Sequence, residues 1–210
     1  GFFDSPAKFK NGKGRLVVNS GDVMYDNSMY FASLAEQKSD ILTRLNVKPG
    51  EFILTTIHRP NNTDDPVRLT AIISSLLSIT ERDGITLVLP LHPRTKNLLD
   101  KNLAKNVYDK LISSPGVKII PPASFFEIIV LEKNARIVMT DSGGVQKESF
   151  FFERPCVILR PETEWVEIVE HGAGIIADAD TERIINAYDK LVGTAPTFPP
   201  LFGDSHASEH

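Results

Sequence analysis

The sequence predicts an α/β fold, in which helices cover both faces of a parallel β-sheet. Short apolar segments alternate along the chain with longer stretches of helical periodicity, and this order produces parallel strands. Most of the apolar segments are continuous rather than alternating in polarity, as expected for strands buried on both faces. No internal repeat or linker interrupts the pattern, so we expect a single domain.

Six runs of mainly apolar residues are the expected strands: Arg15–Asn19, Phe52–His58, Ile85–Leu91, Val117–Ile120, Arg136–Thr140 and Cys156–Arg160. The expected helices lie between and after them: Met24–Gln37, Pro66–Glu81, Lys96–Leu111, Phe125–Lys133, Val145–Phe152, Trp165–Glu170 and Glu182–Leu191. The helix at Pro66–Glu81 is the best marked of these. Two aspartates precede the proline of its first turn, and its apolar residues recur at helical spacing.

The composition excludes several classes of protein. The chain has 210 residues, enough for a sizeable core, and a net charge of −4, which gives no basic surface for nucleic acid. No apolar run is long enough to span a membrane, and the first residues lack the pattern of a signal peptide. Cys156 is the only cysteine, so no internal disulfide forms. We therefore expect a cytoplasmic protein that binds neither nucleic acid nor membrane.

The segment Thr140–Gly144 is the first candidate site, because two glycines open a predicted helix directly after a strand. One interpretation is functional: without Cβ atoms, an anion reaches the free N–H groups of the helix start, where the helix dipole also favours it. The other is structural, a tight turn capped by Asp141 or Ser142. Glu148 follows on the same helix face and is either an acceptor for a ribose diol or a solvated residue.

Two pairs of histidine and arginine follow two other strands. His58 and Arg59 end one strand, and His92 and Arg94 follow another. Each pair either supplies donors to a phosphate or belongs to a surface loop stopped by proline. Ligands of open α/β sheets bind outside the carboxyl ends of the strands. The two pairs and the glycine turn would therefore converge on one crevice lined with donors for an anion.

The segment Glu162–Glu167 follows the last predicted strand and carries paired carboxylates. Glu164 and Glu167 would share a helix face, either as acid and base or as an acidic first turn that suits the helix dipole. Thr163 either caps that helix or binds a ligand, and Trp165 is expected to pack.

Other motifs of known chemistry do not occur in the sequence. It has no P-loop, no Gly-x-Ser-x-Gly nucleophile turn and no histidine spacing typical of a metal site. Gly172-Ala173-Gly174 lacks the third glycine of a dinucleotide fingerprint and follows a predicted helix. We expect no metal.

Taken in order, these segments resemble the non-hydrolysing UDP-N-acetylglucosamine 2-epimerase family. The matching stretches are Gly21–Asp26, His58–Asn62, His92-Pro93, Thr140–Gly144 with Val145–Glu148, Glu162–Glu167, and Gly203-Asp204 with Ala207-Ser208. The resemblance implies the Rossmann-like C-terminal half of a two-domain GT-B fold. Residues 1–210 would form a single nucleotide-binding domain, with a core at 15–193 and a tail at 194–210 that leads toward a last helix. The N-terminal domain would be absent.

The resemblance also implies the residues that bind UDP. On the diphosphate it places His58, Ser142, Gly143 and Gly144, with His58 stabilising UDP as the leaving group. It places Glu148 on the ribose, and Arg94, Thr163 and Glu164 near the same cleft.

The sequence departs from the family pattern at two places. The family aromatic residue that meets uracil aligns with Ile128, so we expect Phe125 or Phe126 to take its place. Pro60-Asn61 stands where many members carry a glutamate, so no carboxylate role carries over to that loop.

Members of the family are understood to eliminate UDP to a 2-acetamidoglucal and to add it back after reprotonation on the other face of C2. This interconverts UDP-GlcNAc and UDP-ManNAc without a metal or nicotinamide cofactor. The acid and base carboxylates lie mainly in the N-terminal domain, so we expect this chain alone to be inactive. The full-length enzyme is expected to be a homodimer.

Alternatives remain for the substrate and for the function. The subgroup that the chain most resembles acts on UDP-2,3-diacetamido-2,3-dideoxy-glucuronate, a close analogue of UDP-GlcNAc. The same half-domain would also serve a GT-B glycosyltransferase, which transfers the sugar to an acceptor. A non-catalytic sensor of sugar nucleotides is a further possibility.

Overall fold

The computed structural model describes residues 9–10, 16–17 and 20–209. A six-stranded parallel sheet in the order β5-β4-β3-β6-β7-β8 lies at its centre. Its strands are β3 (Phe52–Thr56), β4 (Thr86–Pro90), β5 (Val117–Ile120), β6 (Ile137–Thr140), β7 (Cys156–Ile158) and β8 (Gly174–Ile176). The predicted α/β class is confirmed.

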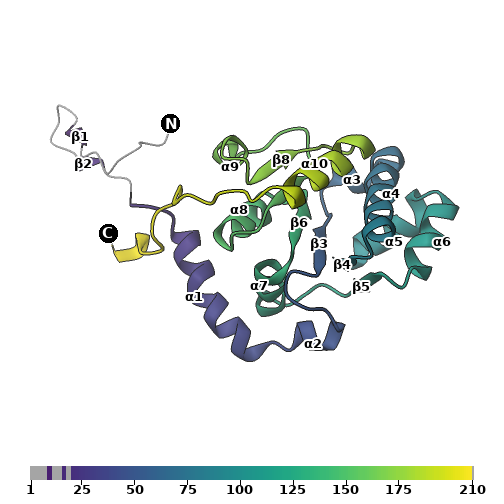
Figure 1. Ribbon diagram of the computed structural model, residues 1–210, viewed down its shortest axis with the longest axis horizontal. Helices are drawn as coiled ribbons and strands as arrows, with labels where there is room; N and C mark the ends of the chain where they lie inside the picture. Colours follow the sequence, from purple (N-terminus) through teal and green to yellow (C-terminus); the bar gives the residue numbers. More distant parts are fainter. Residues whose placement is uncertain (1–8, 11–15, 18–19, 210) are drawn as a thin grey trace.

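Helices cover both faces of this sheet (Figure 1). On one face lie α4 (Pro66–Asp83), α5 (Pro93–Asn102), α6 (Lys105–Ser113) and α10 (Thr181–Gly193). On the other lie α1 (Val23–Lys38), α2 (Ile41–Leu45), α7 (Phe125–Asn134) and α8 (Gly143–Phe151). Two short helices, α3 (Pro60–Thr63) and α9 (Val166–Glu170), and the 3-10 turn η1 (Ala207–Glu209) complete the described elements.

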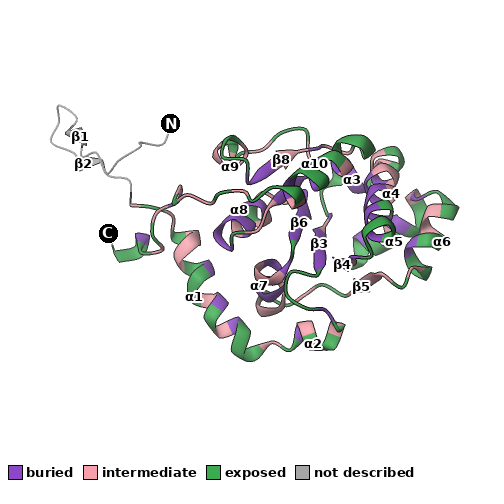
Figure 2. Ribbon diagram, viewed as in Figure 1, coloured by how far each residue is buried: buried purple, intermediate pink, exposed green. Residues whose placement is uncertain are grey.

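The core consists of two apolar layers that the sheet separates. Along β3, Ile53 points into the layer beneath α4 and α10, whereas Phe52 and Leu54 point into the layer beneath α1 and α7. All three side chains are fully buried, and Figure 2 shows the central strands as a buried block. Burial on both faces explains why the strand sequences are continuous apolar runs.

The sheet has one topological switch point, between β3 and β6. From β3 the chain builds outward through β4 to β5, then returns to the other side of β3 as β6 and builds outward through β7 to β8. The segments that follow β3 and β6 therefore leave in opposite directions. Such a divergence opens a crevice at the carboxyl ends of the strands, where open α/β sheets bind their ligands.

The first predicted strand is wrong as a member of this sheet. Of Arg15–Asn19, only Leu16–Val17 is described; it forms β2, which pairs antiparallel with β1 (Phe9–Lys10). The sixth parallel strand is instead β8, which begins at Gly174 just after α9. Three residues that begin with glycine carry too little apolar pattern to be recognised as a strand.

The helix predicted at Lys96–Leu111 is two helices. Leu103 ends α5 with an extended ψ of 144°, and α6 starts after Ala104. Leu99, Leu103 and Leu111 all reach the same core layer, so the apolar periodicity continues across the break and hides it. The short helices α2 and α3 were not predicted, since a few residues give no helical period.

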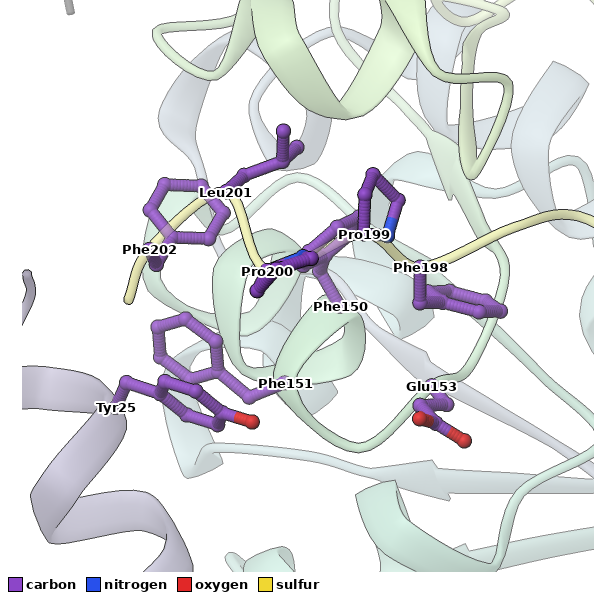
Figure 3. Close-up of a pocket in the computed structure, with 9 residues that line it drawn as sticks. All are labelled: Tyr25, Phe150, Phe151, Glu153, Phe198, Pro199, Pro200, Leu201 and Phe202. Carbon is purple, nitrogen blue, oxygen red and sulfur yellow. The ribbon is translucent and has the colours of Figure 1, made fainter. Parts of the chain in front are cut away.

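The tail after α10 packs across α8 and reaches the start of α1 (Figure 1). Phe202 meets Phe150 and Phe151 edge to face at 5.5 Å, and Tyr25 stacks on Phe151 at 4.7 Å between centroids. Figure 3 shows these rings gathered between α1, α8 and the tail. Such ring pairs add to the area that they bury, so this proline-rich segment is fixed by aromatic packing.

Backbone hydrogen bonds fix the same tail to α1. The Asp22 N–H donates to the Phe202 carbonyl at 3.0 Å, and the Asp26 carboxylate accepts from the N–H groups of Ala207 and Ser208. Desolvation raises the pKa of Asp26, but the hydrogen bonds from Ser208 and Ala207 together outweigh it, so the pKa lies below its ordinary value. The tail and α1 thus form one unit.

We predict that Gly203→Ala loosens this unit. A Cβ at Gly203 would lie 2.9 Å from the Cα of Gly21, and φ is +95°, a conformation that alanine rarely adopts. Clash and strain together should cost about 1–3 kcal/mol. Gly50→Ala is the matched control, because φ is +75° there and nothing lies within 4 Å of the added Cβ. Thermal denaturation should show the larger loss of Tm for Gly203→Ala; equal losses would contradict the close-contact argument.

Candidate functional site

The carboxyl ends of β3 and β6 bring two of the predicted segments together. Thr56 and Thr140 end these strands, and their hydroxyl oxygens share a hydrogen bond of 2.6 Å. The Asp141 N–H donates to the Thr56 carbonyl at 3.3 Å. The loop that begins at His58 and the turn that begins at Asp141 therefore start side by side at the switch point.

Asp141 joins the two segments. Its side chain is fully buried and accepts hydrogen bonds from the backbone N–H groups of His58 and Arg59 at 3.1 and 3.0 Å. The side-chain amide of Asn62 donates to it at 3.1 Å. A carboxylate buried without such donors would be costly. Asp141 therefore fixes the loop after β3, a role that the sequence-based interpretation as a helix cap did not include.

The ring of His58 leans on the same carboxylate. Its Nδ1 lies 3.2 Å from Asp141 Oδ1, and the side chain is 51% exposed. An Nδ1–H that donates to Asp141 sets the orientation of the imidazole and leaves Nε2 on the opposite edge of the ring. The structure thus holds His58 as an oriented and accessible histidine at the switch point.

Helix α8 begins beside this histidine loop. Ser142 is its N-cap, and its hydroxyl accepts from the Val145 N–H at 3.5 Å. Gly143 and Gly144 are the first helical residues, whose N–H groups have no partner inside the helix. A Cβ on Gly144 would make only ordinary contacts, with Met24 Cε at 3.8 Å and Ser142 Oγ at 3.9 Å. The fold itself therefore tolerates a side chain at Gly144, and its absence leaves the helix start open.

Gly143 lies in closer surroundings. A Cβ there would lie 3.2 Å from Glu164 Oε2, and its carbonyl accepts a hydrogen bond from Trp165 Nε1 at 2.7 Å. Trp165 also packs in the aromatic cluster with Phe150 and Phe202, as expected from the sequence.

Arg160 is a charged residue of this edge that the sequence analysis missed. Its guanidinium binds both carboxylate oxygens of Glu164, at 2.8 and 2.9 Å, and its side chain is only 14% exposed. The ion pair lowers the pKa of Glu164 and raises that of Arg160. Arg160 follows β7 just as His58 follows β3. The rule that ligands bind outside the carboxyl ends of the strands (the strand-end rule) would have indicated Arg160. The predicted strand Cys156–Arg160 included this residue, so it was not considered.

The predicted pairing of Glu164 and Glu167 on one helix face is wrong. α9 starts only at Val166, so Glu164 lies ahead of the helix and turns back to Arg160. Thr163 is not the N-cap of α9, which is Trp165. Its hydroxyl donates to Gln146 Oε1 at 2.6 Å and accepts from the Trp165 N–H at 3.0 Å. Thr163 and Glu164 are thus fixed against the first turn of α8.

The second histidine–arginine pair is engaged in its own local contacts. His92 is the N-cap of α5, and Arg94 makes a two-point ion pair with Asp64 at 2.9 and 3.0 Å. These residues follow β4, which flanks β3 on the side away from β6. The structure therefore ties Arg94 to the end of α3 and not to the turn at Asp141.

Glu148 lies one helical turn beyond Gly144 in α8, and Phe125 and Phe126 open the neighbouring helix α7. Glu148 is half-buried rather than solvated, and burial raises its pKa. Ile128 and Phe126 are half-buried and pack against the core layer, whereas Phe125 is 55% exposed. Of the three residues expected near a base, only Phe125 offers a largely exposed ring.

Neither a metal-binding cluster nor a membrane-spanning helix is found within residues 20–209 and the two short strands before them. No group of three or more histidine, cysteine, aspartate or glutamate side chains is arranged to hold a metal ion. No helix in this described part is long and apolar enough to cross a membrane.

Comparison with known proteins gives a consistent result. A sequence profile described as UDP-N-acetylglucosamine 2-epimerase matches residues 9–210. A Methanococcus maripaludis protein named UDP-N-acetylglucosamine 2-epimerase homolog is 38% identical over 91% of this chain and 52% of its own length. A Pseudomonas aeruginosa protein named UDP-2,3-diacetamido-2,3-dideoxy-D-glucuronate 2-epimerase is 39% identical over 93% of this chain and 51% of its own length. The chain thus spans about half the length of the curated relatives that it matches.

Solved structures agree with the sequence matches. The UDP-GlcNAc 2-epimerase of Methanocaldococcus jannaschii superposes with a TM-score of 0.84 at 33% identity, over 92% of this chain and 53% of that one. A second structure of it, in complex with UDP-GlcNAc and UDP, gives a TM-score of 0.81 at the same identity. The fold is therefore the Rossmann-like half of the GT-B architecture. On the profile match and these relatives, the chain belongs to the UDP-N-acetylglucosamine 2-epimerase family.

Proposed function

We propose that this chain is the UDP-binding half of a 2-epimerase that acts on an N-acetylated UDP-hexosamine. The joint at Asp141 carries the proposal, because it holds the His58 loop beside the amino end of α8. An oriented histidine and an open helix start on one sheet edge are suitable donors for a diphosphate. The related M. jannaschii enzyme solved with UDP-GlcNAc and UDP supports nucleotide binding by this fold.

The diphosphate would lie against the first turn of α8. The N–H groups of Gly143 and Gly144 and the hydroxyl of Ser142 face it, and the helix dipole favours its charge. Glu164 would bring an opposing negative charge close to Gly143, and its ion pair with Arg160 neutralises that charge. This gives Arg160 a role in the site.

Two further residues would border the same cleft. Thr163 is fixed to Gln146 in the first turns of α8 and would line the diphosphate side. Arg94 is half-exposed and held by Asp64, which makes it a donor at the outer edge next to β4.

The nucleoside would follow α8 toward α7. Glu148 lies one helical turn beyond Gly144, so its carboxylate is placed to accept hydrogen bonds from the ribose diol. The exposed ring of Phe125 offers a face on which uracil would stack. Ile128 packs into the core layer and offers no such face.

The proposed chemistry depends on UDP as a leaving group. Inversion at C2 of a 2-acetamido sugar requires loss of a weakly acidic proton, which elimination of UDP accomplishes. Negative charge then develops on the diphosphate, and oriented donors such as His58 Nε2 and the α8 amides stabilise it. They would also retain UDP until it adds back after reprotonation. The acid and base that move the C2 proton would belong to the rest of the whole protein.

The proposed substrate class is an N-acetylated UDP-hexosamine. The relatives at 38% and 39% identity bear the names of UDP-N-acetylglucosamine and of a UDP-diacetamido-uronate. The two sugars share the UDP group and the acetamido group at the carbon that is inverted. The residues proposed for the site would meet the shared UDP group, so we propose the class rather than one sugar.

For the whole protein we propose a cytoplasmic homodimer. The one cysteine of this chain supports the location, since Cys156 is fully buried and burial raises its pKa to about 12. Such a thiol is unreactive and needs no oxidising compartment.

The variant Gly144→Ala should separate binding from folding. A Cβ at Gly144 makes only ordinary contacts in the protein, and alanine favours the helix by up to about 1 kcal/mol. The same Cβ would stand where the diphosphate approaches, so we expect about a tenfold loss of UDP affinity, or about 1.4 kcal/mol. Calorimetric titration with UDP measures this. Gly193→Ala at the end of α10 is the control and should bind UDP normally; a Gly144→Ala variant that also does so would argue against the site.

Turnover should require the rest of the whole protein. The 210-residue chain should bind UDP without epimerising UDP-GlcNAc, whereas the whole protein in D₂O should exchange the C2 proton of its substrate without any acceptor. NMR of the sugar C2 position measures both. Transfer only in the presence of an acceptor would indicate a glycosyltransferase, and binding without exchange by the whole protein would indicate a sensor. Epimerisation by the 210-residue chain alone would contradict the division of labour proposed above.

A further inference from the structure

A carboxyl group with no partner lies inside the protein behind the proposed ribose site. Glu132, on α7, is 1% exposed, and neither of its side-chain oxygens has a hydrogen-bond partner among the described residues. Polar groups buried in this way are uncommon, because each loses its water without compensation. The position lies in a helix whose neighbouring residues are apolar core, so a leucine would serve the fold better.

Glu148 is the charged group that affects the pKa of Glu132. α7 packs against α8, and the charge of Glu148 acts on Glu132, raising its pKa beyond the rise caused by burial. Burial also raises the pKa of Glu148. Cys156 on β7 is the third ionisable group of this cluster, and its thiol bonds to Ser149. The cluster therefore has two carboxyl groups and a neutral thiol.

The cations on the surrounding helices have other partners. Lys133 pairs with Glu36 of α1, Arg44 of α2 pairs with Glu127, Lys147 of α8 pairs with Asp22, and Lys38 of α1 lies over the Phe126 ring. Asp26 of α1 is bound to the tail. Arg154, between α8 and β7, has a buried Nε without a hydrogen-bond partner, but only burial and Glu148 shift the pKa of Glu132. In the described part of the chain no cation is paired with Glu132 or Glu148. Two neighbouring carboxyl groups without a cation do not both ionise readily, so one retains a proton.

We propose that Glu132 is a positioning residue of the nucleotide site, which stays protonated and donates its O–H to the Glu148 carboxylate when a ribose diol binds. Glu132 is the more deeply buried of the two and so keeps the proton. Glu148 is the anion and accepts from the diol, while the bond from Glu132 holds its carboxylate in place and favours its charged form. The orphaned group of the unliganded protein thereby gains its partner on binding.

The proposal rests on the proposed function, since it assumes that Glu148 meets a ribose. It adds that ribose recognition involves two carboxyl groups and one proton. A protonated acid behind the acceptor differs from a structural residue in one measurable way: its removal should affect binding only of ligands that have the diol.

The experiment is a calorimetric titration of the 210-residue chain with two probes, UDP and 2′,3′-dideoxy-UDP. The variants are Glu132→Leu, which removes the donor, Glu132→Gln, which keeps a neutral donor of similar shape, and Glu148→Gln. Asp189→Asn on the opposite layer is the control, because its ion pair with Arg82 is exposed and remote from this cluster.

We expect Glu132→Leu to bind UDP about tenfold more weakly and to bind dideoxy-UDP like the unmodified chain. Glu132→Gln should bind UDP nearly as tightly as the unmodified chain, because glutamine keeps a neutral donor. The affinity for UDP should rise with pH as Glu148 ionises, and the midpoint should lie at higher pH in Glu132→Leu, since a donor to the charged form is lost. Equal losses for both probes, or no loss in Glu132→Leu, would overturn the proposal.

The same titrations distinguish an error in the proposed UDP and ribose binding from an error in the role of Glu132. If the unmodified chain does not bind UDP, the proposed function is wrong. If Glu148→Gln binds UDP and dideoxy-UDP with the same affinity ratio as the unmodified chain, the ribose role of Glu148 is wrong. If Glu148→Gln loses the preference for UDP while both Glu132 variants keep it, only the role of Glu132 is wrong.

Stability measurements test the proton itself. A carboxyl whose pKa is raised by folding stabilises the protein when protonated, and this contribution is lost as pH rises through the folded pKa. The free energy of unfolding of the unmodified chain should therefore fall relative to that of Glu132→Gln as pH rises from the ordinary carboxyl pKa through the raised pKa of Glu132. Parallel curves for the two proteins in urea would show that Glu132 holds no such proton.

Discussion

The buried carboxylate of Asp141 is the interaction on which the arrangement of the site depends. β3 and β6 are neighbours, but the chain leaves them in opposite directions, so the two segments that follow would separate without a link. Asp141 supplies it by accepting from the backbone of His58 and Arg59 and from the amide of Asn62. Asn62 also donates to the Leu159 carbonyl at 2.8 Å, which extends the link to the end of β7. Three strand ends are thus held at fixed distances.

Helix α8 is held mainly by polar and aromatic contacts. Lys147 is buried, pairs with Asp22 of α1, and lies 4.1 Å from the centroid of the Trp165 ring. Such a charge is retained inside a protein only with its partners in place. Together with the two glycines at its start and the carboxyl groups behind it, α8 combines several features that lower stability. Proteins accept such features where a site needs them, which agrees with the position of α8 at the switch point.

Much of the fold was predictable from the sequence, because the buried strands and long amphipathic helices leave continuous patterns. The missed elements lack a pattern: β8 is short and begins at Gly174, and the break at Leu103 lies inside an unbroken apolar period. For the site, the strand-end rule brought His58 and Ser142–Gly144 together correctly. It did not reveal that Asp141 holds the loop or that Arg160 holds Glu164, because these depend on side-chain directions across strands far apart in sequence. Nor does a lone glutamate such as Glu132 stand out within a helical stretch.

The contact between Trp165 and Gly143 has a practical consequence. The chain has one tryptophan, and its indole N–H is bonded to the carbonyl of the first helical residue of α8, with an ammonium group over the ring. Indole emission responds to nearby charge and to the strength of this hydrogen bond. The chain therefore carries its single tryptophan at the glycine turn, and the state of that turn is open to optical observation through indole emission in unlabelled material.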